Sequence, residues 1–84
     1  MAYRESYKAD IDDAVLGCLP DATEADLYWY PSKGTSIADI VQTGLRVGAV
    51  RNSLKRLLEE EIVVRAWDGN QRMGRYVYAR KVEA

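Results

Sequence analysis

The segment Ser36–Leu57, SIADIVQTGLRVGAVRNSLKRL, carries the clearest pattern in this chain of 84 residues. Its first apolar residues are spaced three and four positions apart: Ile37, Ile40 and Val41. This spacing predicts a short helix, and Ser36 is a suitable N-cap for it. Gly44 is expected to end the helix, because glycine readily adopts the left-handed backbone of a tight turn. Leu45 would then face inward.

A second helix is predicted from about Val47 to Glu60, because its apolar residues recur with the 3.6-residue period of a helix. These apolar residues are Val50, Leu54, Leu57 and Leu58. The opposite side is polar and mostly basic, with Arg51, Asn52, Lys55 and Arg56. Two helices joined by a short glycine turn make a helix-turn-helix, predicted here over residues 36–60.

After residue 61 the pattern changes from helix to strand. Ile62–Trp67 is rich in β-branched and aromatic residues, and Arg75–Arg80 alternates again, so each stretch predicts a strand. The turn residues Asp68-Gly69-Asn70 follow the first strand. The pattern therefore predicts a β-hairpin over residues 62–80, with a loop of five to eight residues. One face of the second strand is expected to join the core, and Trp67 is expected to pack on the core or on the hairpin.

The first part of the chain predicts one helix and an aromatic connecting segment. The helix is expected from about Ser6 to Leu19, where Pro20 stops it. Its apolar face consists of Ile11, Val15, Cys18 and Leu19. In the connecting segment, residues 20–34, Thr23 is placed to cap a short helical turn. The cluster Tyr28-Trp29-Tyr30 follows, and we expect it either in the core or at a dimer contact; both readings stay open.

A helix-turn-helix followed by a hairpin with a basic tip resembles the winged helix-turn-helix DNA-binding family, which includes many small prokaryotic and phage transcription regulators. The resemblance covers residues 36–80. It implies an α+β fold in which residues 1–84 form a single domain of three helices and a C-terminal β-hairpin wing. Two positions depart from the family pattern. Arg46 stands where a Ser or Thr often caps the recognition helix, and Glu61 stands where a glycine often precedes the wing.

The same resemblance implies which residues contact DNA. The expected DNA-binding residues are Arg46, Val47, Gly48, Arg51, Asn52, Lys55, Arg72 and Arg75. The N-terminal half of the second helix would enter the major groove, where Arg51 suits guanine and Asn52 suits adenine. Lys55 would contact phosphates, while Arg72 and Arg75 of the wing would reach the minor groove or the backbone.

The remaining basic residues of the second half are assigned other roles. Arg56, further along the helix, would also touch phosphates. Arg65, Arg80 and Lys81 lie on the predicted strands, where charged side chains commonly keep a sheet edge from pairing with other chains. We therefore expect these three residues to protect the sheet edge and not to bind DNA.

The composition of the chain excludes several classes of function. With no histidine and a single cysteine, Cys18, the chain offers no disulfide of its own, no zinc site and no His-based catalytic set. We therefore expect no enzyme activity, no metal and no cofactor, and we expect Cys18 to be a small core residue. No apolar run approaches about 18 residues, and no secretion signal is present. These features predict a cytoplasmic protein without a membrane partner.

Charge is distributed unevenly along the chain. Residues 1–42 hold three basic and eight acidic side chains, a charge of −5, and residues 43–84 hold nine and five, a charge of +4. The basic half suits double-stranded DNA, and a homodimer is expected because so small a domain covers only half a site. Two alternatives stay open at this point. The acidic, aromatic half would bind a protein partner, as an interaction module or inhibitor, or the two halves would neutralise each other.

Overall fold

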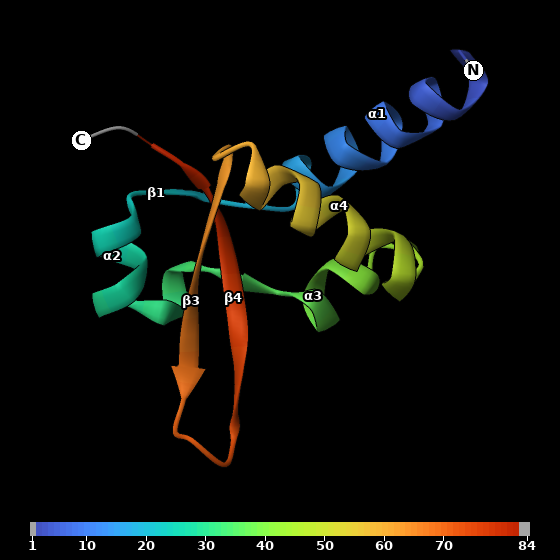
Figure 1. Ribbon diagram of the computed structural model, residues 1–84. Coiled ribbons are helices and arrows are strands. Elements are labelled where there is room, and N and C mark those ends of the chain that lie inside the picture. The colour runs from blue at the N-terminus through green and yellow to red at the C-terminus, as the bar shows by residue number, and fades with distance from the viewer. Residues whose placement is uncertain (1, 83–84) are drawn as a thin grey trace.

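A computed structural model describes the backbone of residues 2–82 and the side chains of residues 9–82 (Figure 1). Its helices are α1 (Ala2–Gly17), α2 (Glu24–Trp29), the short 3₁₀ turn η1 (Pro31–Lys33), α3 (Ile37–Val41) and α4 (Val47–Glu59). Its strands are β1 (Asp21–Ala22), β2 (Thr35–Ser36), β3 (Val63–Gly69) and β4 (Gly74–Lys81). The chain is thus an α+β domain with four α-helices and a mixed four-stranded sheet across the described residues.

The strand β4 lies at the centre of the sheet. It pairs antiparallel with β3 along its length, from Val63 opposite Arg80 to Gly69 opposite Gly74. Its other edge pairs antiparallel with β2 at residues 77–78 and then parallel with β1 at residues 80–81. Segments that are far apart in the sequence therefore converge on β4, while β3 pairs with β4 alone among the strands of residues 2–82.

Both faces of this sheet are covered. On one face Tyr78 and Val63 pack into a core with α1, α3 and α4. On the other face Val77, Ala79 and their neighbours on β3 pack with Leu27 of α2. The expectation that one face of β4 joins the core is met by Tyr78, and α2 adds a second layer that buries the other face as well. Three consecutive residues of β4, 77–79, are buried as a result.

The helix bounds differ from the expectation where local hydrogen bonds decide them. The helix α1 begins at Ala2, before the predicted Ser6, and ends at Gly17. After it, the amides of Cys18 and Leu19 donate to carbonyls three residues back, which tightens the chain into a turn. Leu19 nevertheless reaches the core, at 3% exposure.

The connecting segment contains a fourth helix where three helices were predicted in all. The hydroxyl of Thr23 accepts a hydrogen bond from the amide of Asp26 at 3.0 Å, as expected for an N-cap, and α2 follows as a full helix. The core placement of Tyr28-Trp29-Tyr30 is wrong, because α2 buries Leu27 and turns these three rings outward.

The segment between α3 and α4 has the predicted cap and glycine turn, although α3 ends at Val41, before Gly44. The hydroxyl of Ser36 accepts from the amide of Asp39 at 3.3 Å, and Gly44 has a φ of 102°. Leu45 packs against the core. Arg46 occupies the N-cap of α4 without a side-chain cap bond, so this helix begins without the hydroxyl cap common at such positions. The helix ends at Glu59, one residue before the prediction.

The hairpin loop is shorter than predicted, with four residues, 70–73, between β3 and β4. Gly69 has a φ of 127°, which begins the turn immediately after β3. The side-chain oxygen of Asn70 then accepts hydrogen bonds from the amides of Arg72 and Met73, at 2.9 and 2.7 Å. These bonds close the loop within the hairpin tip.

The junction between α4 and β3 contains a strained residue. Glu61 has a φ of 60°, the left-handed conformation, which is unfavourable for any residue with a Cβ. Its amide donates to the carbonyl of Leu58, so the conformation is part of the way α4 ends. The position where winged-helix proteins often carry a glycine therefore does require a left-handed backbone here.

We predict that Glu61→Gly raises the free energy of unfolding by about 0.5–1 kcal/mol, because relief of the left-handed strain outweighs the entropy of the glycine. The matched control is Glu60→Gly, since Glu60 has a right-handed φ of −84°. In this control the free energy of unfolding should fall by about 0.5–1 kcal/mol. Urea unfolding of both variants measures the difference, and equal losses would contradict the assigned backbone.

Candidate nucleic-acid interface

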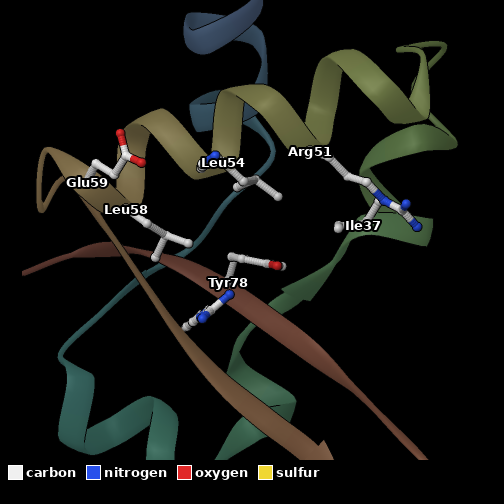
Figure 2. A pocket seen from close by; sticks show the side chains of 8 residues that line it. Ile37, Arg51, Leu54, Leu58, Glu59 and Tyr78 are labelled. Atoms are coloured by element: carbon white, nitrogen blue, oxygen red, sulfur yellow. The ribbon is translucent and has the colours of Figure 1, made fainter.

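An open groove lies between α4 and the face of the sheet that α4 covers. Its volume is about 600 Å³, and Figure 2 shows side chains from the helix and the sheet lining it. The apolar lining consists of Ile37, Leu54, Leu58 and Tyr78. The charged lining consists of Arg51, Lys55, Arg65 and Glu59. The groove thus combines an apolar surface with three bases and one acid.

The core packing of α4 fixes which of its side chains face outward. Val50, Leu54 and Leu57 are buried, which locks the rotation of the helix. Because a helix has 3.6 residues per turn, positions 48, 51, 52 and 55 then share the outward side, and all four are exposed. Val47, at 48% exposure, begins this side at the first turn. The structure therefore brings the predicted α4 residues together, beside Arg46 at the N-cap.

Gly48 has open space around it. A Cβ added at this position would meet no atom within 4 Å. No packing constraint within the described residues therefore requires a glycine in this turn of α4. The missing side chain instead leaves helix backbone accessible beside Arg51 and Asn52.

The prediction that Arg56 touches phosphates is not supported by its surroundings. Its Nη2 lies 2.7 Å from Oδ1 of Asp12 on α1, and the hydroxyl of Ser53 donates to the same oxygen at 2.6 Å. The side chains of Arg56 and Asp12 are 32% and 22% exposed. Arg56 therefore joins α4 to α1 and points away from the outward side of the helix. Asp12 and Arg56 are 44 residues apart in the sequence, and no local pattern indicates that they pair.

Arg65 is the residue that the sequence analysis missed. It was expected to protect the sheet edge, yet it lines the groove together with Arg51 and Lys55 of α4. Its guanidinium carbon lies 4.2 Å from the centre of the Tyr76 ring, a cation–π contact that restrains the side chain. Its position follows from the strand register, which places Arg65 directly opposite the core residue Tyr78, and the sequence alone carries no signal for that register.

The other strand bases behave differently from Arg65. Arg80 pairs with Asp21 of β1, with Nε 2.8 Å from Oδ1. Lys81 is exposed and lines a neighbouring hollow with Glu24 and Glu61, which shares Leu58 and Arg65 with the groove. Neither residue lines the groove beside α4.

The hairpin tip carries Arg72 in its loop and Arg75 on β4, and both are exposed. Trp67 stabilises the tip, in agreement with the prediction that it packs on the hairpin. Its indole N–H donates to the carbonyl of Asn70 at 2.9 Å, and its ring meets Tyr76 edge-on at 5.0 Å. The two arginines are thus presented on a hairpin whose shape is fixed by hydrogen bonds and ring packing.

Arg75 is not on the same side of the sheet as the groove. Arg75 lies on the same face of β4 as Val77 and Ala79, which face α2. It lies opposite Asp68 of β3. The predicted site residues therefore form two groups. One group lies on the outward side of α4, where Arg51 and Lys55 line the groove, and the other occupies the hairpin tip, which projects beyond the helices (Figure 1).

The residues that the structure describes contain neither a metal-binding cluster nor a membrane-spanning helix. No group of three or more Cys, Asp and Glu side chains among them is arranged to hold a metal ion. No helix between residues 2 and 82 combines the length and apolar character that crossing a bilayer requires. Cys18 is half-buried and packs against the core, with its thiol 3.3 Å from the carbonyl of Ala14.

No family model matches the chain, and neither a curated protein nor a solved structure shows significant similarity to it. The resemblance to winged-helix regulators therefore rests on the sequence of residues 36–80 and has no support from these comparisons. Function has to be argued from the geometry described above.

We predict that Asp12→Ala lowers the free energy of unfolding by about 1–3 kcal/mol, because it leaves the buried Ser53 hydroxyl and the half-buried Arg56 without their shared acceptor. The control is Asp13→Ala at an exposed neighbouring position, which should change stability by no more than about 0.5 kcal/mol. Urea denaturation of the two variants gives the comparison. Similar values for both would mean that the contact between α1 and α4 does not depend on this carboxylate.

Proposed function

We propose that this chain is a winged helix-turn-helix protein that binds double-stranded DNA and regulates transcription. One observation carries the proposal. Arg51, Lys55 and Arg65, from two different elements, line a single open groove. None of the three forms an ion pair with any of the side chains described for residues 9–82. Bases that have no internal partner and share one surface are the electrostatic signature of a phosphate-binding face.

The order and packing of the elements support the same proposal. A short helix, a glycine turn and a longer helix precede a two-stranded hairpin, which is the winged-helix order. The 13 residues of α4 give a rod roughly 20 Å long with one exposed side. A helix of this kind fits the major groove of B-DNA, which is about 12 Å wide.

The chain's own acidic half leaves this surface open. Arg51, Asn52 and Lys55 are exposed, and Arg56 is the α4 base that an acid of the first half neutralises among the described side chains. Glu59 at the far end of the groove is its one acidic lining residue. Neutralisation of the basic half by the acidic half therefore applies to Arg56 on α4 and to Arg80 on β4. It leaves the bases of the groove without an acidic partner.

In this proposal the outward side of α4 has distinct roles along its length. Arg51 and Asn52 would hydrogen-bond base edges, and exposed Val47 would contact a thymine methyl group. Gly48 would let the helix backbone approach the DNA closely. Lys55 and Arg65 would hold the phosphate chain that passes along the groove, and the hairpin tip with Arg72 would contact the backbone or the minor groove.

The test is selection of bound duplexes from a random pool, followed by affinity measurements over a range of salt concentrations. A regulator should enrich one motif, and paired half-sites in that motif would indicate the proposed homodimer. Affinity should fall steeply as salt rises, because bound counterions are released from the phosphates. Absence of any duplex binding at about 50 mM salt would overturn the proposal.

Three substitutions should separate base reading from phosphate contact. Arg51→Ala should weaken binding to the selected duplex about 5- to 150-fold and should weaken binding to a random duplex much less. Arg65→Gln should weaken binding to both duplexes equally, and it should reduce the slope of log affinity against log salt concentration by about 1. Lys33→Gln is the charge-matched control on η1, beside Tyr30, and should change neither quantity.

An unchanged salt slope in Arg65→Gln would remove this residue from the interface. Equal losses on both duplexes in Arg51→Ala would mean that Arg51 contacts phosphate and does not read a base. Each outcome is distinguishable from a general loss of folding by the thermal unfolding curve of the variant.

We further predict that Gly48→Ala raises the free energy of unfolding by about 0.5 kcal/mol and weakens DNA binding about fivefold. The methyl group finds open space and improves helix propensity, but it holds the helix away from the DNA and breaks one close contact worth about 1 kcal/mol. The matched control is Gly17→Ala on α1, where a Cβ also meets no atom within 4 Å. This control should stabilise the fold and leave affinity unchanged, whereas equal affinities in both variants would contradict a close approach at Gly48.

A further inference from the structure

Three consecutive aromatic residues stand exposed on α2 and at its end. Tyr28, Trp29 and Tyr30 are 69%, 73% and 59% exposed. Such rings are normally among the more buried side chains, and an exposed group of them commonly marks an interaction surface. The core of the protein does not need these rings, because α2 is already anchored by fully buried Leu27.

The surface contains a hollow with both aromatic and acidic walls. It has a volume of about 460 Å³ and is lined by Glu24, Ala25, Tyr28 and Trp29. The rings of Tyr28 and Trp29 meet edge-on with centres 5.3 Å apart, so they form two walls at nearly a right angle. A carboxylate beside electron-rich ring faces is the arrangement that attracts a cationic side chain.

The same aromatic cluster already holds one cation of this chain. The Nζ of Lys33 lies 5.0 Å from the centre of the Tyr30 ring. No basic side chain of residues 9–82 lies over the rings of Tyr28 and Trp29 in this way. These two rings therefore offer a cation site that the described part of the chain leaves open, and Glu24 beside them, which also borders the hollow of Lys81, forms no ion pair with a described base.

We propose that the hollow formed by Glu24, Tyr28 and Trp29 binds a lysine or arginine side chain in a basic segment of a partner protein. The site goes beyond the proposed DNA binding and does not depend on it. The helix α2 covers the sheet face opposite to the one that α4 covers (Figure 1). The partner and a DNA duplex would therefore occupy different sides of the molecule.

Charge and size distinguish this occupant from two others. A nucleic acid would place phosphates next to the carboxylates of Glu24 and Asp26, which repel them. A second copy related by a two-fold axis through the hollow would bring Glu24 against its own counterpart. Three rings of about 150–250 Å² each, about two-thirds exposed, offer roughly 300–500 Å², well below the 800 Å² per partner of a standard interface. This area suits a short segment.

The experiment is a titration of the full-length protein, labelled with ¹⁵N, with a blocked heptapeptide of alternating glycine and lysine. Shifts should concentrate at the Trp29 indole N–H and at the amides of α2, and the corresponding glutamate peptide should leave them unmoved. Trp29→Ala should weaken binding about 2- to 30-fold, the range of one cation–π contact. Glu24→Gln should weaken it as well, with a loss that shrinks as salt is added.

Two control variants make the outcome specific to this hollow. Met73→Ala removes another exposed apolar side chain, and Glu60→Gln removes another exposed carboxylate. Both should bind the lysine peptide as the unmodified protein does. Equal weakening by the controls, or unchanged binding in Trp29→Ala, would overturn the proposal.

The two other candidate occupants, a second copy of the chain and a nucleic acid, would give different results. Sedimentation that shows a dimer lost in Trp29→Ala would assign the hollow to a second copy and refute the proposal. Binding of single-stranded DNA that is lost in the same variant would assign it to nucleic acid, with the same consequence. Duplex binding and its salt slope should be unchanged in Trp29→Ala, so failure of this proposal and failure of DNA binding are observed separately.

Discussion

The burial of β4 on both of its faces is the constraint on which the rest of the structure depends. Tyr78 joins the core made with α1, α3 and α4, while its neighbours Val77 and Ala79 join the core made with α2. Residues of one short strand thus anchor two helical layers, and β1, β2 and β3 all pair with it. Because alternate residues of a strand point to opposite faces, the register of β4 fixes at once which surface each layer presents.

This arrangement separates two outward surfaces of different chemistry. The layer of α4 presents Arg51 and Lys55 beside Arg65 of β3, and the layer of α2 presents aromatic rings beside Glu24. The charge difference between the two halves of the sequence becomes, in part, a difference between the two sides of the sheet. The ion pairs of Asp12 with Arg56 and of Asp21 with Arg80 are exceptions, and the first of them holds α1 against α4.

The features that follow from local chemistry could be predicted from the sequence, and those set by register could not. The caps at Thr23 and Ser36, the turn at Gly44 and the apolar side of α4 each involve residues within one or two helical turns. The groove position of Arg65 depends on which residues of β3 and β4 face each other. The outward turn of Trp29 depends on Leu27 filling the second core, and the hairpin length on hydrogen bonds of Asn70. Distant pairing decides all of these.

The net charge of −1 is compatible with DNA binding for a reason that the layers make plain. The helices α2 and α4 cover opposite faces of the sheet, and Arg51, Lys55 and Arg65 together line the groove on the α4 side. Glu24 of α2 lines a neighbouring hollow with Arg65, yet none of the three groove bases forms an ion pair with a described side chain. The groove therefore keeps a local excess of positive charge, three bases against the single acid Glu59. Affinity for a polyanion should therefore follow the charge of this one face and be insensitive to the total charge of the chain.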